Sequence, residues 1–376
     1  MLTTAETLAS ATTAVADRTG LTLRFPDGFA FTFHPIWLRE QSDDADSRDA
    51  RTGQRLSDAS SLPLDLAVTA ASVAGDEVAV GFGDGATARF AVSQLRAAVD
   101  RPRPPELHGE RVLWDASLSA LPEAAFADVE RDPAALRDAL GKVAAYGFVL
   151  VRGVPVEMDG AARFARLVGP MRETNWGTLA DVKFIPEAYD LSMTSRALEP
   201  HTDNPYRHPV PGYILLHCLT NDVTGGDSTL SDGFACAAML KRRDPDAFRA
   251  LTEIRPNFRY ADAEAVLESA GPLIELDSDG EVRQVRFSNR TEQVPALPAG
   301  DLDRYYRARR EWVRLITGPA MTVGFKLGPG DMLMMDNYRL FHGRSAFQTA
   351  TGIRHMRQCY LDRDSVSSRY KLLAPS

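Results

Sequence analysis

The chain of 376 residues contains few cysteines and no long apolar run. Its three cysteines, Cys218, Cys236 and Cys359, are far apart and odd in number, which argues against a disulfide framework and excludes a CxxC site. No apolar stretch approaches the ~20 residues of a membrane span. The N-terminus has neither the basic start nor the apolar core of a signal peptide. We therefore expect a cytoplasmic protein with no membrane partner.

Positive charge is also in deficit. The sequence has 43 Lys and Arg against 51 Asp and Glu, a formal net charge of −8. This balance argues against nucleic acid as the main partner. Hydrophobic residues make up 44% and charged residues 25%, as in globular proteins that bury a real core. The length is typical of two domains, or of one large domain with an appendage.

The first part of the chain, 1–105, carries short alternating segments. Residues 21–40 predict a hairpin around Pro26-Asp27-Gly28, and residues 77–99 predict a second hairpin that turns at Gly83-Asp84-Gly85 and is followed by a short helix. Residues 100–110 contain three prolines and are typical of a linker. We expect a small β-rich N-terminal domain followed by a separate larger domain.

The larger part, 110–376, is mainly β with covering helices. Helical spacing runs through 132–147, with Asp132 as the expected N-cap and Gly147 near the end. Further helices are predicted at 234–254 and 302–318, and strands at 148–155, 212–220, 228–232, 282–289 and 331–343. Many strands without βαβ alternation favour a jelly roll, a double-stranded β-helix, over a doubly wound sheet.

Histidine is scarce, with seven in the chain, and two of them occur in informative places. His201 and Asp203 form an HxD pair in a proline-broken segment, and His342 ends an apolar strand before a glycine. Two histidines and one carboxylate on one face of a metal form the facial triad of non-haem Fe(II) oxygenases. The pair alone also fits an acid–base couple, a zinc hydrolase site or hydrogen bonding within a loop.

One arginine that follows His342 in the sequence is a candidate for binding a carboxylate. Arg354 lies twelve residues after His342 on another predicted strand. A guanidinium grips a carboxylate with two parallel hydrogen bonds, which lysine does not do. A 2-oxoglutarate molecule needs such a partner for its distal carboxylate. Taken alone, Arg354 fits an ordinary surface salt bridge equally well.

Four motifs in order resemble the γ-butyrobetaine hydroxylase group of the taurine dioxygenase-like superfamily. They are HTDNPYRHPVPGYILLHCL, VTGGDSTLSDGF, MDNYRLFHGRSAF and RHMRQCYLD, and the N-terminal FHPIWLRE and RTGQRL also resemble that group. The resemblance covers nearly the whole chain. It implies an Fe(II)- and 2-oxoglutarate-dependent dioxygenase that consumes O2, releases succinate and CO2, and forms a homodimer.

The resemblance also assigns roles to residues. His201, Asp203 and His342 become the catalytic iron ligands, Arg354 binds the 2-oxoglutarate C5 carboxylate, and Ser228 assists. The presence of Asp203 disfavours a halogenase. Animal relatives hold a structural zinc through cysteines after the WLR segment, but the matching stretch 40–52 has no cysteine. We therefore expect no structural zinc.

Relatives hold a trimethylammonium group between aromatic rings, since a quaternary ammonium has no N–H and ring faces attract it by cation–π interaction. Trp176 and Tyr360 fall at such positions, whereas Ala180 and Met193 replace other rings of the butyrobetaine enzymes. Tyr206 and Tyr189 offer replacement rings. Core packing is the alternative for each of these aromatic side chains.

The anionic end of the substrate is expected near residues 286–293. Asn289 aligns with a carboxylate-binding asparagine, and the adjacent Arg290 adds a charge that suits a dianion. The best match is 2-(trimethylammonio)ethylphosphonate, hydroxylated at the carbon next to phosphorus. The alternatives are hydroxylation of γ-butyrobetaine to carnitine, hydroxylation of trimethyllysine, and a non-catalytic quaternary-amine binder. Arg290 pointing to solvent would remove the reason to prefer the phosphonate.

Overall fold

The computed structural model describes residues 11–44, 47–100, 110–188 and 190–374. Contacts between Cα atoms divide the chain into two compact units, Met1–Pro104 and Pro105–Ser376. Most of the predicted linker, at 101–109, lies outside the described residues. In the part of the chain that is described, no helix has both the length and the apolar character needed to cross a membrane.

The smaller unit contains two three-stranded antiparallel sheets around one apolar core. Both predicted hairpins are confirmed, and the first turns at Gly28, whose φ of +84° favours glycine. The elements are β1 (Thr13–Asp17), β2 (Gly20–Arg24), β3 (Ala30–Phe33), α1 (Pro35–Glu40), β4 (Val68–Ala74), β5 (Glu77–Phe82), β6 (Thr87–Ala91) and α2 (Val92–Asp100).

A polar network organises the segment that follows α1. Asp44 accepts hydrogen bonds from the hydroxyl groups of Ser42 at 2.5 Å and Ser47 at 2.9 Å, and from Arg39 at 3.2 Å. The same Arg39 pairs with Asp84 at 3.1 Å. These contacts join the segment to the hairpin between β5 and β6, so hydrogen bonds and ion pairs hold this part of the unit together.

The larger unit is built on two facing sheets. The first has the order β10-β24-β12-β21-β8-β7, with β9 also paired to β24, and the second has the order β11-β22-β14-β20. The strands of the first are β7 (Glu123–Ala125), β8 (Phe148–Arg152), β9 (Met171–Arg172), β10 (Ala180–Lys183), β12 (Tyr213–Asn221), β21 (Met332–Asp336) and β24 (Arg354–Leu361). Those of the second are β11 (Leu198–His201), β14 (Ser228–Asp232), β20 (Thr322–Phe325) and β22 (Leu340–Arg344). A short pair joins β13 (Thr224–Gly225) to β23 (Phe347–Gln348).

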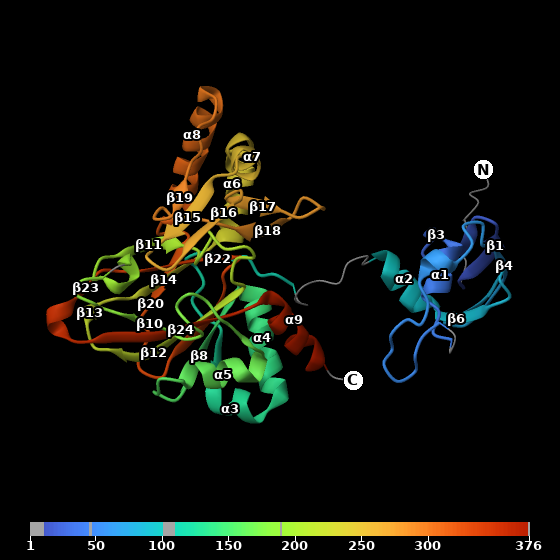
Figure 1. Cartoon of the computed structure of the whole chain (residues 1–376), viewed down its shortest axis with the longest axis horizontal. Coiled ribbons are helices and arrows are strands. Elements are labelled where there is room, and N and C mark those ends of the chain that lie inside the picture. The colour runs from blue at the N-terminus through green and yellow to red at the C-terminus, as the bar shows by residue number, and fades with distance from the viewer. Residues whose placement is uncertain (1–10, 45–46, 101–109, 189, 375–376) are drawn as a thin grey trace, which may run out of the picture. The chain divides into compact units, whose positions relative to one another are not determined.

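Alternate side chains of the strands serve two cores. On β8, Val149 and Val151 pack with helices, whereas Phe148 and Leu150 pack between the sheets. The covering helices are α3 (Phe126–Arg131), α4 (Pro133–Tyr146), α5 (Gly160–Val168) and α9 (Arg363–Leu372), grouped on one side in Figure 1. The prediction of a mainly β jelly roll with covering helices is confirmed.

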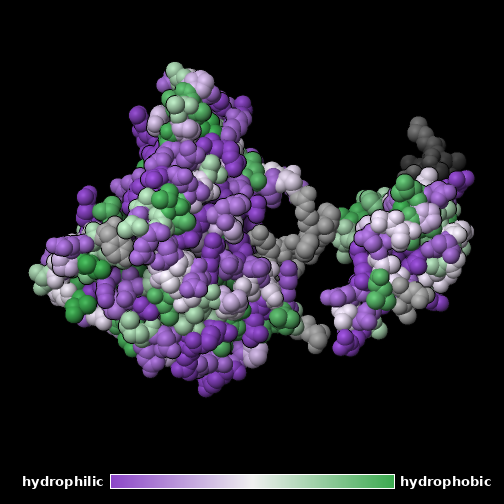
Figure 2. Space-filling model, viewed as in Figure 1, coloured by the Kyte–Doolittle hydropathy of each residue, from purple (hydrophilic) through white to green (hydrophobic). Residues whose placement is uncertain are grey.

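On the opposite side in Figure 1, three helices and several short strands form a lobe with its own apolar core. They are α6 (Gly233–Arg243), α7 (Pro245–Glu253), α8 (Ala299–Ile316), β15 (Asn257–Ala261), β16 (Val266–Ala270), β17 (Ile274–Leu276), β18 (Val282–Val285) and β19 (Glu292–Gln293). On the face shown in Figure 2, hydrophobic residues form separate small areas among hydrophilic ones. Scattered apolar side chains of this kind are normal on a protein surface.

Two segments predicted as single elements are divided. The helix predicted at 234–254 is two helices, because Asp244 caps α7 and Pro245 occupies its first turn. The strand predicted at 331–343 is also two: β21 belongs to the first sheet and β22 to the second, with a turn at 337–339 between them. The chain therefore crosses from one sheet to the other just before His342.

His217 on β12 gives the larger unit an acid-sensitive core. The side chain is fully buried, and neither ring nitrogen has a hydrogen-bond partner of ordinary geometry among the described residues. Burial lowers the pKa of His217 to about 4, against smaller opposing effects of the Val154 backbone and Asp331. Between that value and its ordinary pKa near 6.5, the unfolded chain binds a proton that the folded chain does not.

We expect acid to destabilise the protein through this residue. At pH 5.0, protonation of His217 in the unfolded state should cost about 2 kcal/mol of folding free energy relative to pH 7.5. Urea unfolding of wild type and His217→Leu at both pH values checks this. Between pH 7.5 and pH 5.0, the variant should lose about 2 kcal/mol less folding free energy than wild type loses. Equal losses in the two proteins would contradict the prediction.

Candidate active site

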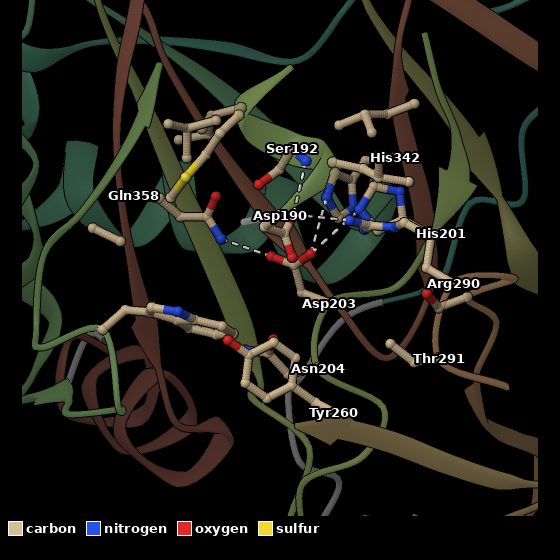
Figure 3. Close-up of a pocket in the computed structure, with 18 of the residues that line it drawn as sticks. Asp190, Ser192, His201, Asp203, Asn204, Tyr260, Arg290, Thr291, His342 and Gln358 are labelled. Atoms are coloured by element: carbon tan, nitrogen blue, oxygen red, sulfur yellow. Dashed lines mark hydrogen bonds and ion pairs between the residues drawn. The ribbon is translucent and has the colours of Figure 1, made fainter. Parts of the chain in front are cut away.

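Three metal-ligating side chains meet where β11 and β22 pair. His201, the last residue of β11, lies directly opposite His342 on β22, and their ring centroids are 4.3 Å apart. Asp203 follows two residues after β11, and its Oδ1 lies 3.4 Å from His201 Nε2 and 3.5 Å from His342 Nε2. One ligand atom from each residue lies within 4.8 Å of the others (Figure 3).

The backbone that carries Asp203 is clamped by Asn337, a fully buried residue in the turn between β21 and β22. Asn337 Oδ1 accepts from the Asp203 N–H at 2.8 Å. Its Nδ2 donates to the carbonyls of Asp203 and Pro211, both at 3.0 Å. The motif MDNYRLFHGRSAF contains Asn337 but gave it no role, because its contact with Asp203 joins positions 134 residues apart in the sequence.

The carboxylate of Asp203 is oriented by two donors. Its Oδ2 accepts from Gln358 Nε2 at 2.6 Å and from the Tyr360 hydroxyl at 2.8 Å, both on β24. The other oxygen, Oδ1, is thereby turned toward the two histidines (Figure 3). Partners of this kind fix the geometry of a metal ligand. Tyr360, predicted for substrate binding, therefore contacts a metal ligand through its hydroxyl.

The donor set suits Fe(II). Burial, followed by the charge of His342, lowers the pKa of His201 to about 4, so that its imidazole is neutral at physiological pH. His201 Nδ1 lies 2.8 Å from the Glu199 carbonyl, which leaves Nε2 as the lone-pair donor. Burial opposes ionisation of Asp203, but the two imidazoles hold its pKa well below the usual range. Two imidazoles and one carboxylate form the facial triad of Fe(II) oxygenases.

Replacing Tyr360 with phenylalanine should weaken iron binding. The change removes one of the two donors on Asp203 Oδ2 while keeping the ring, and loss of such a partner typically costs 10–100-fold in metal affinity or activity. Competition with a chelator measures the iron affinity of the variant. Tyr370→Phe, on α9, is the matched control. Unchanged iron affinity with impaired substrate binding would instead assign Tyr360 to the substrate alone.

The guanidinium of Arg354 is buried and has no anionic partner among the described residues. Only 5% of the residue is exposed, and no hydrogen bond or ion pair to its guanidinium occurs within the described residues, where Nε is a buried donor without a partner. Burial lowers its pKa to about 10, so it remains charged at neutral pH. Ser228, on β14, lines the same cavity and is itself buried. A buried guanidinium without a protein anion fits a carboxylate ligand.

These groups surround one cavity of about 880 Å³. Every predicted site residue lines it except Asn289, which is exposed and donates to the Glu199 carboxylate instead. Arg290 lines the cavity and pairs with Asp190 at 3.2 Å. Tyr189 lies outside the described residues.

Aromatic rings form one wall. Tyr206 stacks on Tyr260 with ring centroids 5.2 Å apart, and Trp176 meets Tyr260 edge-on at 5.3 Å. Ala180 and Met193 also line the cavity, without adding rings. Sequence reasoning missed Tyr260, which comes from β15 in the lobe, because nothing in the alternation of NFRYA distinguishes it from a packing residue.

Comparisons with known proteins agree with this geometry. Residues 110–360 match the model of the taurine catabolism dioxygenase TauD, TfdA family. The chain is 33% identical to a γ-butyrobetaine dioxygenase of Pseudomonas sp. strain AK-1, covering 96% of this chain and 95% of the relative. It is 28% identical to a trimethyllysine dioxygenase of Meyerozyma guilliermondii, covering 95% and 94%.

A solved structure shows the same fold. It is a candidate alpha-ketoglutarate-dependent taurine dioxygenase from Burkholderia xenovorans, with a TM-score of 0.50 at 18% identity over 66% of this chain and 92% of that one. The resemblance inferred from the motifs is confirmed. The chain belongs to the taurine catabolism dioxygenase TauD, TfdA family, and it is a dioxygenase that uses iron and 2-oxoglutarate.

Proposed function

We propose that the protein hydroxylates a small trimethylammonium zwitterion, with 2-(trimethylammonio)ethylphosphonate as the best candidate and the carbon next to phosphorus as the site of reaction. The observation that carries the proposal is the composition of one cavity. Aromatic rings, the triad and four arginines line it, and Arg290 and Arg354 are two of these arginines, beside Arg259 and Arg344. Such a cavity offers places for an onium group, a metal and two different anions.

Each residue has a distinct task in this proposal. Arg354 grips the distal carboxylate of 2-oxoglutarate, and His201, Asp203 and His342 hold the iron. The iron, with 2-oxoglutarate and O2, supplies oxidation of a C–H bond coupled to release of succinate and CO2. The rings of Trp176, Tyr206 and Tyr260 hold the trimethylammonium group by cation–π attraction. Fixing both ends of the substrate restricts which carbon faces the metal.

Arg290 favours a phosphonate over a carboxylate. A guanidinium forms stronger hydrogen bonds with a more highly charged acceptor, and phosphonate offers more oxygens than carboxylate. The second candidate is γ-butyrobetaine. It is supported by the 33% identity, over almost the whole chain, to a relative named for that substrate.

One comparison separates the two candidates. Iron- and 2-oxoglutarate-dependent O2 consumption is measured with trimethylammonium compounds that end in phosphonate or in carboxylate. Selective turnover of the phosphonate, with hydroxylation next to phosphorus, supports the first proposal. Preference for γ-butyrobetaine, with carnitine as product, overturns it in favour of the second. Absence of turnover with all of these compounds overturns both.

Replacing Arg290 with alanine should lower kcat/KM for the phosphonate by about 10–100-fold, because a hydrogen bond to a charged group contributes about 1.5–3 kcal/mol. The carboxylate analogue should suffer less. Arg283→Ala is the matched control, since Arg283 lies on β18 with half of its side chain exposed and pairs with Glu275. Equal, small effects of both substitutions would contradict a role of Arg290 in anion binding.

A further inference from the structure

The wall of the active-site cavity carries a negative charge that neither the iron site nor the 2-oxoglutarate site uses. Asp190 Oδ1 lies 3.2 Å from Arg290, and both side chains are about one-quarter exposed, at 27% and 24%. The same oxygen accepts from the Ser192 N–H at 2.7 Å, which fixes the carboxylate at the start of the short helix Leu191–Met193 (Figure 3). Both members of the ion pair line the cavity.

The charge of Asp190 reaches the aromatic wall of the cavity. Burial raises the pKa of Tyr206 and of Tyr260, and the negative charge of Asp190 contributes to both shifts. Both rings line the same cavity as Asp190.

We propose that Asp190 is a specificity-determining residue that supplies the counter-charge for the onium end of the substrate, while its partner Arg290 takes the acidic end. This inference rests on the proposed function. A quaternary ammonium cannot donate a hydrogen bond, so its recognition depends on ring faces and on nearby negative charge. Asp190 adds such a charge to a cavity that Tyr206 and Tyr260 also line and where Ala180 and Met193 contribute no rings.

The pairing of Asp190 with Arg290 also selects the length of the substrate. When a zwitterion binds, its acidic group replaces Asp190 at Arg290, and its onium group replaces Arg290 at Asp190, so no charge on the wall loses its counter-charge. Because the paired wall atoms are only 3.2 Å apart, a compact zwitterion satisfies both at once and a longer one does not.

The test compares wild type with Asp190→Asn. Asparagine keeps the shape and still caps the helix through the Ser192 N–H, so the substitution removes charge with little change in the loop. Glu187→Gln is the matched control, because Glu187 is an exposed carboxylate three residues earlier. Affinities are measured by calorimetry without O2, on enzyme loaded with Fe(II) and 2-oxoglutarate. The ligands are 2-(trimethylammonio)ethylphosphonate and its uncharged-headed isostere 3,3-dimethylbutylphosphonate, with γ-butyrobetaine and 5,5-dimethylhexanoate as a second pair.

Wild type and Glu187→Gln should bind each onium compound more tightly than its isostere. In Asp190→Asn the onium should bind about tenfold more weakly, whereas the isostere should bind equally or more tightly, since a nearby charge acts only on the charged head. Compact onium compounds should lose more affinity than long ones.

Two results would overturn the inference alone. One is turnover of onium compounds by wild type together with an onium-to-isostere ratio in Asp190→Asn that stays within about twofold of wild type. The other is tighter onium binding by Asp190→Asn, which would make Asp190 only a competitor for Arg290. If wild type neither binds nor turns over any onium compound, the proposed function fails and this inference fails with it.

Discussion

Replacing Arg354 with alanine will raise the 2-oxoglutarate concentration needed for half-maximal turnover by about thirtyfold or more. Truncating one partner of a buried, hydrogen-bonded charge pair costs about 2–5 kcal/mol, and each 1.4 kcal/mol is tenfold in affinity. Arg354 is buried, remains charged and has no protein anion among the described residues. We propose the distal carboxylate of 2-oxoglutarate as the partner of this group.

The same substitution should not lower the stability of the ligand-free protein. Burial lowers the pKa of Arg354 to about 10, which means that the ligand-free fold bears a free-energy cost for keeping the guanidinium charged. Arg354→Ala should therefore leave the unfolding free energy of the ligand-free protein unchanged or raise it. Thermal unfolding without 2-oxoglutarate measures this, and addition of 2-oxoglutarate should stabilise wild type but not the variant.

Arg354→Lys separates charge from geometry. It keeps the positive charge but loses the two-pronged grip, so its affinity for 2-oxoglutarate should lie between those of wild type and the alanine variant. Iron affinity should be the same in all three proteins, because Arg354 makes no contact with the triad. Loss of stability in Arg354→Ala with an unchanged requirement for 2-oxoglutarate would show that the residue is structural.

The three residues of the triad could be found from the sequence because they lie in motifs that resemble the family, whereas the role of Arg354 stays a prediction. His201 and Asp203 are two residues apart, and His342 and Arg354 stand on strands whose apolar runs are visible in the sequence. The boundaries of the strands were harder to predict from the sequence. An apolar run does not show that β21 and β22 lie in different sheets, because both are buried and the turn at 337–339 contains no glycine or proline.

The substrate end of the cavity was harder to predict, because its walls come from segments far apart in the chain. Tyr260 belongs to the lobe, and it meets Trp176 and Tyr206 only through tertiary packing. Asn289 looked like an anion ligand by position, but it bonds to Glu199 outside the cavity wall. The ion pair of Asp190 and Arg290 spans one hundred residues, and local pattern carries no information on such a contact. The homodimer stays a prediction.

Arg339, in the turn before β22, is buried like Arg354 but has an anionic partner. Arg339 is 2% exposed, and its partner Asp232 is fully buried. Arg339 donates to both carboxylate oxygens of Asp232, at 3.1 and 2.7 Å, and to the carbonyls of Ala145 at 2.8 Å and Val112 at 2.5 Å. Asp232 also caps α6 through the Phe234 N–H at 3.0 Å. This pair joins β14, α6 and the turn that leads to β22.

Removing Arg339 should therefore destabilise the larger unit by about 3–5 kcal/mol, since a buried charge left without its partner costs that much. Arg339→Met, which keeps most of the apolar stem, isolates the loss of charge and hydrogen bonds. Asp232→Asn should destabilise the protein in the same way. The double variant should lose clearly less stability than the sum of the two single losses, because each single substitution leaves the other side chain buried without its partner. Urea unfolding of the four proteins gives this cycle. Additive losses, or single losses below about 1 kcal/mol, would contradict the prediction. The folded fraction of Arg339→Met should still bind 2-oxoglutarate normally, because Arg339 is not among the residues that line the cavity.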